Sequence, residues 1–162
     1  MRRRELLRSW KPWLGVLAAG AGWPTLARWL HLEPAAADET WVDAGKLGDL
    51  PEDGWEPRRL AVRRRDHWRE SVRSETVYLR RRGEAVEALS AVCPHGGCLV
   101  RQQADAFACP CHQGRFDSDG GRVEGPARRG LDPLPVRIGR GRVQVRHRLF
   151  RGGISDREPV AG

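Results

Sequence analysis

Hydrophobic and polar residues alternate over short runs along most of the chain, which is the pattern of half-buried β-strands. Such runs, bounded by charged residues and glycines, are 41–43, 60–63, 76–79, 86–89, 136–138 and 143–146. The last two flank Gly139-Arg140-Gly141 and predict a β-hairpin. No long stretch beyond residue 40 keeps a helical period. The pattern predicts an all-β, antiparallel domain over residues 41–149, followed by a frayed tail over 150–162.

The N-terminal part differs, because residues 12–27 are almost entirely apolar. As a helix, residues 13–30 would be about 27 Å long, just short of the roughly 30 Å hydrocarbon core of a bilayer. We therefore predict a transmembrane helix within residues 1–31 that anchors the chain, followed by a hinge or linker at 32–40. The alternative is a cleaved signal peptide, because the three alanines that end at Ala37 have the small-residue form that a signal peptidase accepts.

The first residues read Arg2-Arg3-Arg4-Glu5-Leu6-Leu7-Arg8. They resemble the twin-arginine export signal, with Arg3 and Arg4 as the pair. Basic residues beside a membrane helix also face the cytoplasm under the positive-inside rule, and the two interpretations are compatible. Both predict a bacterial-type cell membrane as the location, with the folded head on the periplasmic or outer face.

The net charge of +8 arises partly at the N-terminus. Residues 1–37 hold six basic and two acidic residues, which leaves 23 basic and 19 acidic residues in the remainder. Those arginines are spread singly along strand-like runs without a stacking aromatic platform, which is typical of a solvated face. Nucleic acid is therefore not expected as a partner. The remaining length of about 125 residues suits one globular domain.

All four cysteines and two of the five histidines lie within residues 93–112. The segments are Cys93-Pro94-His95-Gly96-Gly97-Cys98 and Cys109-Pro110-Cys111-His112. So many soft ligands on two short loops predict a metal centre. A tetrahedral zinc would accept two of the thiolates and both imidazoles but would leave two cysteines unexplained. A c-type haem needs two residues between its cysteines, whereas one separates Cys109 from Cys111. A [2Fe-2S] centre with two cysteine and two histidine ligands uses every member if the other cysteines form a disulfide.

At these residues the sequence resembles the Rieske iron–sulfur family, in the disulfide-bearing branch found in quinol–cytochrome c reductases. The motifs C-x-H-x-G-C and C-x-C-H of that branch imply the cluster ligands Cys93, His95, Cys109 and His112 and a disulfide between Cys98 and Cys111. Gly125-Pro126-Ala127 resembles the proline loop that covers the cluster. The implied fold is an antiparallel β-sandwich base with an inserted, loop-rich cluster-binding subdomain at about 92–127.

The resemblance also implies a function. It predicts an electron-transfer subunit rather than a complete enzyme, with cytochrome b and a c-type cytochrome as partners. One electron would pass from quinol to the c-type cytochrome, and His95 or His112 would accept the quinol proton. A first alternative is the small Rieske subunit of arsenite oxidase. A second is a zinc or disulfide binding module without electron chemistry.

One stretch departs from the high-potential members of this branch. Those members follow the second motif with Gly-Ser-x-Tyr, whose hydroxyls donate hydrogen bonds to the sulfurs, whereas this chain has Gln113-Gly114-Arg115-Phe116. Their absence should lower the reduction potential and suit a menaquinol-type complex. The remaining histidines, His31, His67 and His147, have no partners at ligand spacing and are expected at the surface.

Overall fold

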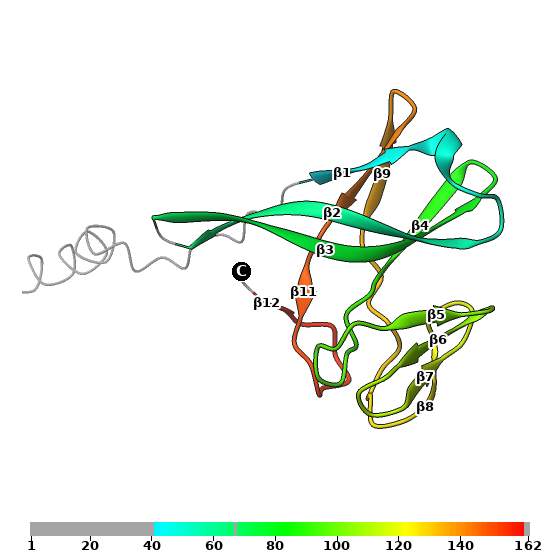
Figure 1. Ribbon diagram of the computed structural model, residues 1–162, viewed down its shortest axis with the longest axis vertical. Helices are drawn as coiled ribbons and strands as arrows, with labels where there is room; N and C mark the ends of the chain where they lie inside the picture. The colour runs from blue at the N-terminus through cyan, green and yellow to red at the C-terminus, as the bar shows by residue number, and fades with distance from the viewer. Residues whose placement is uncertain (1–40, 67, 161–162) are drawn as a thin grey trace, which may run out of the picture. The chain divides into compact units, whose positions relative to one another are not determined.

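The computed structural model describes residues 41–66 and 68–160, which form an all-β domain (Figure 1). Its elements are β1 (Trp41–Lys46), the single 3₁₀ turn η1 (Leu47–Asp49), β2 (Trp55–Asp66), β3 (Arg69–Arg82), β4 (Ala85–Ser90), β5 (Arg101–Gln103), β6 (Ala106–Cys109), β7 (Gly114–Phe116), β8 (Arg122–Glu124), β9 (Val136–Gly139), β10 (Arg142–Arg146), β11 (Leu149–Phe150) and β12 (Pro159–Val160). The predicted antiparallel, all-β class is confirmed for these residues. No helix in this part of the chain is long and apolar enough to span a bilayer. The predicted anchor and hinge, together with His31 and His67, lie outside the described residues.

The base consists of two antiparallel sheets, ordered β1-β10-β9 and β2-β3-β4. Both sheets and the adjoining loops contribute to one core: Ala44, Leu50, Leu60, Val62, Val77, Leu79, Ala88, Leu134, Val143 and Val145. The predicted hairpin of β9 and β10 is present, with Gly139 paired to Arg142. Arg140 and Gly141 both have positive φ, as a tight two-residue turn between twisted strands requires. The base therefore has the antiparallel strands that the alternating runs predicted, arranged in the two-sheet form that the resemblance implied.

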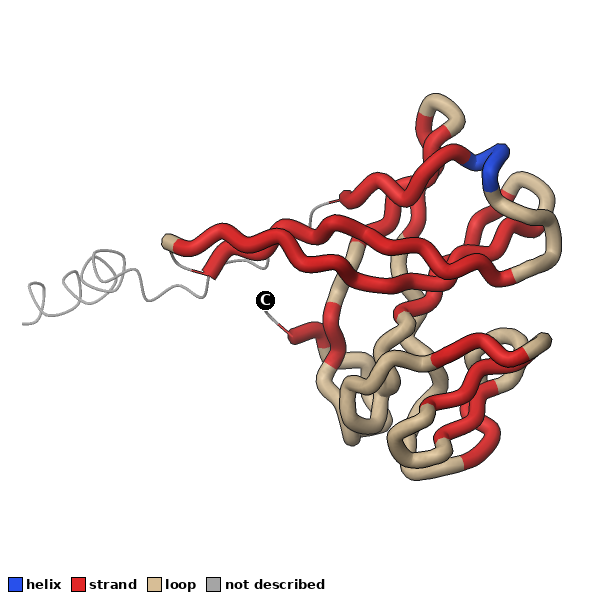
Figure 2. Tube along the Cα trace, viewed as in Figure 1, coloured by secondary structure: helices blue, strands red, loops and turns tan. Residues whose placement is uncertain are grey.

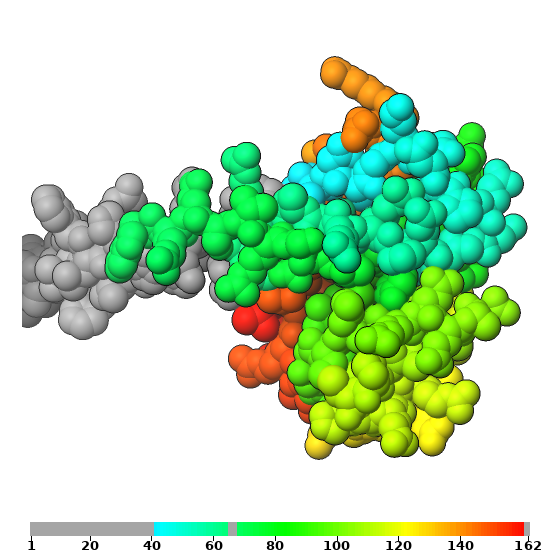
Figure 3. Space-filling view, viewed as in Figure 1, coloured from blue at the N-terminus to red at the C-terminus, as the bar shows by residue number. Residues whose placement is uncertain are grey.

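The β2–β3 ribbon is much longer than the short runs of the sequence suggested. It stays in register from Trp55 opposite Arg80 to Asp66 opposite Arg69. Its inner half covers the base core, whereas the first six residues of β3 are all exposed. Figure 3 shows this outer half projecting from the rest of the described domain. Hydrophobic alternation marks a strand only where the strand covers a core, so the outer half gave no such signal.

A small sheet of four short strands, in the order β5-β6-β7-β8, is inserted in the sequence between β4 and β9 and lies beside the base (Figure 2). Its antiparallel strands have three or four residues each, too short for alternation to reveal them. A second core joins this sheet to the base, with Trp55, Tyr78, Leu89, Ala91, Cys93, Val100, Phe107, Cys109, Phe116, Ala127 and Leu131 as members. The two free cysteines, Cys93 and Cys109, belong to this core, so the candidate metal site borders it.

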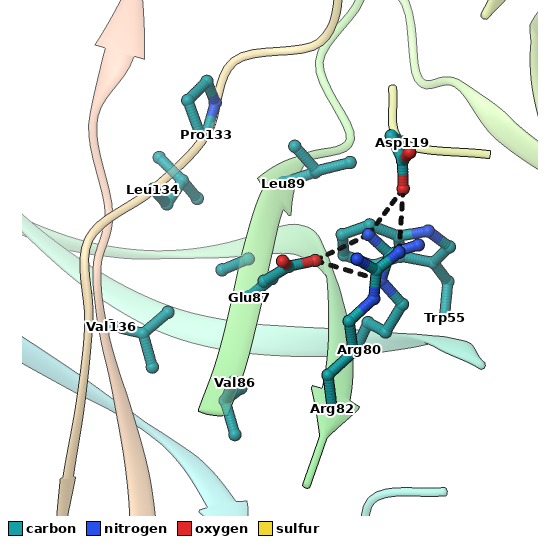
Figure 4. A pocket seen from close by; sticks show the side chains of 11 residues that line it. Trp55, Arg80, Arg82, Val86, Glu87, Leu89, Asp119, Pro133, Leu134 and Val136 are labelled. Carbon is teal, nitrogen blue, oxygen red and sulfur yellow. Dashed lines mark hydrogen bonds and ion pairs between the residues drawn. The ribbon is translucent and has the colours of Figure 1, made fainter. Parts of the chain in front are cut away.

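Arg80 connects the base to the small sheet (Figure 4). Its side chain lies 4.3 Å above the ring of Trp55 and donates hydrogen bonds to Glu87 at 2.6 Å and Asp119 at 2.7 Å. Trp55 Nε1 donates to the carbonyl of Ser118. Trp55, Arg80, Glu87 and Asp119 are among the residues that line a groove of about 460 Å³ beside β4. The hydrogen bond from Arg80 holds the pKa of Asp119 below its usual value.

Two sequence expectations differ from the structure at the C-terminal end. The segment expected to fray from Phe150 onward is paired, with Leu149 opposite Val160 and Phe150 opposite Pro159. Phe150 packs against the base core, which gives the segment an attachment that its polar composition did not indicate. His147 is buried rather than at the surface, and burial lowers its pKa. Glu75 opposes this shift of the pKa of His147, and Arg64 adds to it.

Candidate metal centre

The first ligand loop, 93–98, follows β4 and turns back on itself. Cys93 N donates to Cys98 O at 2.8 Å, and Gly97 N donates to Cys93 O at 2.9 Å. Gly97 has φ +80°, a conformation that glycine adopts without steric cost. The backbone N–H groups of His95 and Gly96 donate hydrogen bonds to the Cys93 sulfur. The loop therefore presents amide donors to a buried sulfur, the arrangement that stabilises a thiolate ligand.

The second ligand loop joins β6 to β7. Cys109 ends β6 and pairs with Gly114, the first residue of β7. Gln113 closes the turn at φ +55°, a conformation that is unusual for a residue with a side chain. The strand pairing fixes the position of Cys109, while His112 lies in the exposed part of the turn. In this loop the cysteine is thus buried and the histidine is exposed.

The four residues predicted as ligands come together in space. Cys93 and Cys109 are each 3% exposed and are not disulfide-bonded. Burial raises the pKa of the Cys93 thiol, as does its hydrogen bond with Cys109, while the amides of its own loop oppose the shift. The rings of His95 and His112 have centroids 4.7 Å apart and are nearly perpendicular. His112 is exposed and His95 is half-buried.

A disulfide between Cys98 and Cys111 joins the two ligand loops, as the resemblance implied. The sulfurs of Cys98, Cys109 and Cys111 lie within 4.8 Å of one another. A disulfide sulfur cannot serve as a thiolate ligand, so these three cysteines do not make a zinc site. Cys93 and Cys109 are the thiols left for a metal among the described cysteines. The donor set is therefore two thiols and two imidazoles.

The predicted proline loop lies against the second ligand loop. A Cβ on Gly125 would come within 2.6 Å of Gly114 Cα and 3.3 Å of Gln113 O. Gly125 also has φ +97°, so this position suits glycine on both counts. Arg122 donates to Gly125 O at 2.8 Å, and Ala127 is buried in the second core. The loop thus packs backbone against backbone beside Cys109.

These features fit a [2Fe-2S] cluster. A pair of buried thiols and a pair of adjacent imidazoles match a cluster with cysteine ligands on one iron and histidine ligands on the other. The fold and the donor set therefore define an all-β iron–sulfur domain with mixed cysteine and histidine ligation. The family model described as Rieske [2Fe-2S] domain matches residues 40–135. The chain belongs to the Rieske family, and its cofactor is a [2Fe-2S] cluster.

Relatives extend this similarity beyond the motifs. The menaquinol:cytochrome c reductase iron-sulfur subunit of Geobacillus thermodenitrificans is 33% identical over 148 residues, which covers 85% of this chain and 86% of the relative. The subunit of the same name from Bacillus subtilis is 29% identical over 130 residues, which covers 76% of this chain and 77% of the relative. The cytochrome b6-f complex iron-sulfur subunit of Chlorobaculum tepidum is 40% identical over 65 residues, which covers 39% of this chain and 36% of the relative.

Sequence reasoning missed one group of residues beside the site. Gly153 N donates to Pro94 O at 2.8 Å, which brings the C-terminal segment onto the first ligand loop. Arg129, which is 7% exposed, donates to Ile154 O at 2.7 Å from the other side. The only sequence signal was the pair Gly152-Gly153, which is equally typical of a loose end.

Proposed function

We propose that this chain is the electron-transfer subunit of a quinol-oxidising cytochrome bc-type complex. In it, the chain takes one electron from quinol and passes it to a c-type cytochrome. The observation that carries the proposal is a pair of adjacent imidazoles, with His112 exposed, on the same two loops as two buried free thiols. Cys93 and Cys109 would hold one iron, and His95 and His112 the other. When bound, the cluster supplies one-electron transfer.

The histidines give this site its coupling to protons. An imidazole that binds a metal through one ring nitrogen keeps the other nitrogen for a hydrogen bond. The exposed ring of His112, or that of His95, can therefore accept a hydrogen bond from a quinol hydroxyl and then its proton. Such a subunit needs a cytochrome b to bind the quinol and a c-type cytochrome to accept the electron.

Two observations favour menaquinol over ubiquinol as the electron donor. Relatives that align with most of this chain are menaquinol:cytochrome c reductase subunits. Positions 114 and 116 carry glycine and phenylalanine, so they offer no hydroxyl to the cluster sulfurs. Fewer hydrogen bonds to the sulfurs favour a lower potential, which matches the lower potential of menaquinol.

We propose further that residues 1–31 anchor the chain in a bacterial-type cell membrane, with the head on the periplasmic or outer face. The apolar run and its basic flank support this placement. Replacing Arg3 and Arg4 by lysine keeps the charge and should block export if the folded-protein pathway recognises the pair. Fractionation of cells that express the variant tests this. Normal delivery of a cluster-loaded head would leave the positive-inside rule as the only role of these residues.

The full chain should be purified from membranes with its partners. We expect two irons per chain, the rhombic resonance spectrum of a Rieske centre, and co-purifying cytochrome b. Cys109→Ser and His112→Ala should each lose the spectrum, because each removes one of four protein ligands. His147→Gln is the control, since His147 is a buried histidine whose charged neighbours are Glu75 and Arg64 of the β2–β3 ribbon and which lies outside both ligand motifs. A spectrum that survives in both ligand variants, or a molybdenum subunit in place of cytochrome b, would contradict the proposal.

A further inference from the structure

The C-terminal strap, defined as residues 149–160, crosses the first ligand loop. Gly153 N donates a hydrogen bond to Pro94 O at 2.8 Å. A Cβ placed on Gly152 would lie 3.0 Å from His95 O and 3.5 Å from Pro94 O. The backbone of the strap therefore lies directly against the two peptide groups that carry His95. Pro94 and His95 sit between the ligand Cys93 and the disulfide-bonded Cys98 in the sequence.

The strap is fixed on both sides of this contact. Before it, Phe150 packs against the base core. After it, Arg129 donates to Ile154 O at 2.7 Å and makes a two-pronged ion pair with Asp132, with both contacts at 2.8 Å. Arg129 and Asp132 are 7% and 3% exposed, so their pairing is shielded from water.

The two arms of the strap also bind each other. Arg151 N donates to Glu158 O at 2.9 Å, and the side chains of the two residues form an ion pair at 3.5 Å. Arg157 reaches the buried carboxylate of Asp132 at 3.4 Å. The strap therefore cannot move away from the first ligand loop without breaking contacts at several points. A displacement at Gly152 would be transmitted to His95.

We propose that the C-terminal strap is a positioning element for the ligand His95: Gly153 binds the carbonyl of Pro94, and Gly152 lies against the carbonyl of His95. This inference rests on the proposed function, because it concerns how that site is held. The disulfide ties the first ligand loop to the second, and the strap ties it to the base and to Arg129. The direction of the His95 ring toward a partner is thus set by residues more than 50 positions away in the chain.

Gly152→Ala in the full chain tests the proposal with a single methyl group. At 3.0 Å the carbonyl of His95 must move by a few tenths of an ångström, because the strap is anchored on both sides. We expect shifted g-values in the resonance spectrum and a shifted midpoint potential, with two irons retained. Gly139→Ala is the matched control, since nothing lies within 4 Å of its new Cβ. A Gly152→Ala spectrum and potential that coincide with those of the wild type would overturn the proposal.

A stop codon after Arg151 gives a second test. It keeps Phe150 in the base core and removes the bonds of Gly153 and Ile154. Cluster loss on mild heating should become about two- to twelvefold faster, which is the weight of the one hydrogen bond that the strap makes to the ligand loop, from Gly153 N to Pro94 O. An unchanged rate would overturn the positioning role. A wild-type chain that binds no iron would instead refute the proposed function, so the two failures are distinguishable.

Discussion

Introducing hydroxyls at positions 114 and 116 should raise the reduction potential. Gly114 is buried opposite Cys109 in the β6–β7 pair. A Cβ at this position would lie 3.6 Å from Cys109 Cβ and 3.8 Å from the ring of Phe116, which are ordinary contact distances. A serine therefore fits, with its hydroxyl beside the carbon that carries the ligand sulfur. The ring of Phe116 is 1% exposed, and its far edge points toward position 114.

The size of the effect follows from the strength of a hydrogen bond to a charged acceptor, about 1.5 to 3 kcal/mol. The reduced cluster carries one more electron than the oxidised cluster, so a donor to its sulfurs stabilises the reduced form. For a one-electron couple a tenfold change in the equilibrium corresponds to about 59 mV. Each new bond should thus raise the midpoint by roughly 60 to 130 mV.

The assay is a potentiometric titration of Gly114→Ser, Gly114→Ala and Phe116→Tyr beside the wild type. Alanine adds the same Cβ without the hydroxyl, so the difference between the two variants at position 114 isolates the hydrogen bond. A Gly114→Ser midpoint no higher than that of Gly114→Ala, together with no rise in Phe116→Tyr, would refute this reasoning. A buried tyrosine hydroxyl without a partner would also lower the stability by about 1 to 3 kcal/mol, which thermal unfolding would detect.

Three further predictions concern stability. Cys98→Ala opens a disulfide that closes a 13-residue interval, and urea titration should show a loss of about 2 to 4 kcal/mol; a reactive Cys98 thiol in the native oxidised protein would contradict the pairing. The pKa of Asp119 is lowered in the folded state, so its contribution is present above the ordinary value of 3.8 and lost as the pH falls below it. Melting temperatures of Asp119→Asn should therefore depend less steeply on pH in that acid range, and equal slopes would count against the pairing with Arg80. The pKa of His147 is lowered from 6.5 by burial, so the unfolded chain takes up its proton first and stability falls as the pH drops below 6.5. His147→Gln should remove this loss, and an unaltered profile of the melting temperature between pH 7 and 5 would show that His147 is accessible to protons.

Short-range patterns in the sequence determined the chemistry of the site. The grouping of the cysteines and histidines on two tight loops predicted a metal centre before any fold was known, because residues on one tight loop are close whatever surrounds them. The resemblance of the two motifs to the Rieske family then implied which residues are the ligands. Gly139-Arg140-Gly141 between two alternating runs likewise predicted the β9–β10 hairpin, since the turn and its strands are neighbours in the chain. The all-β class followed from the same alternation.

Long-range contacts were decided only by the tertiary structure. His147 has no partner at ligand spacing in the sequence and was expected at the surface, but the fold buries its ring. The glycine pair at 152–153 looked like a loose end, but the base core holds Phe150 and thereby directs the pair onto Pro94 and His95. A polar segment of this kind carries no hydrophobic period, because its order comes from backbone hydrogen bonds and ion pairs to residues far away in the chain. Such partners are identified only when the chain is folded.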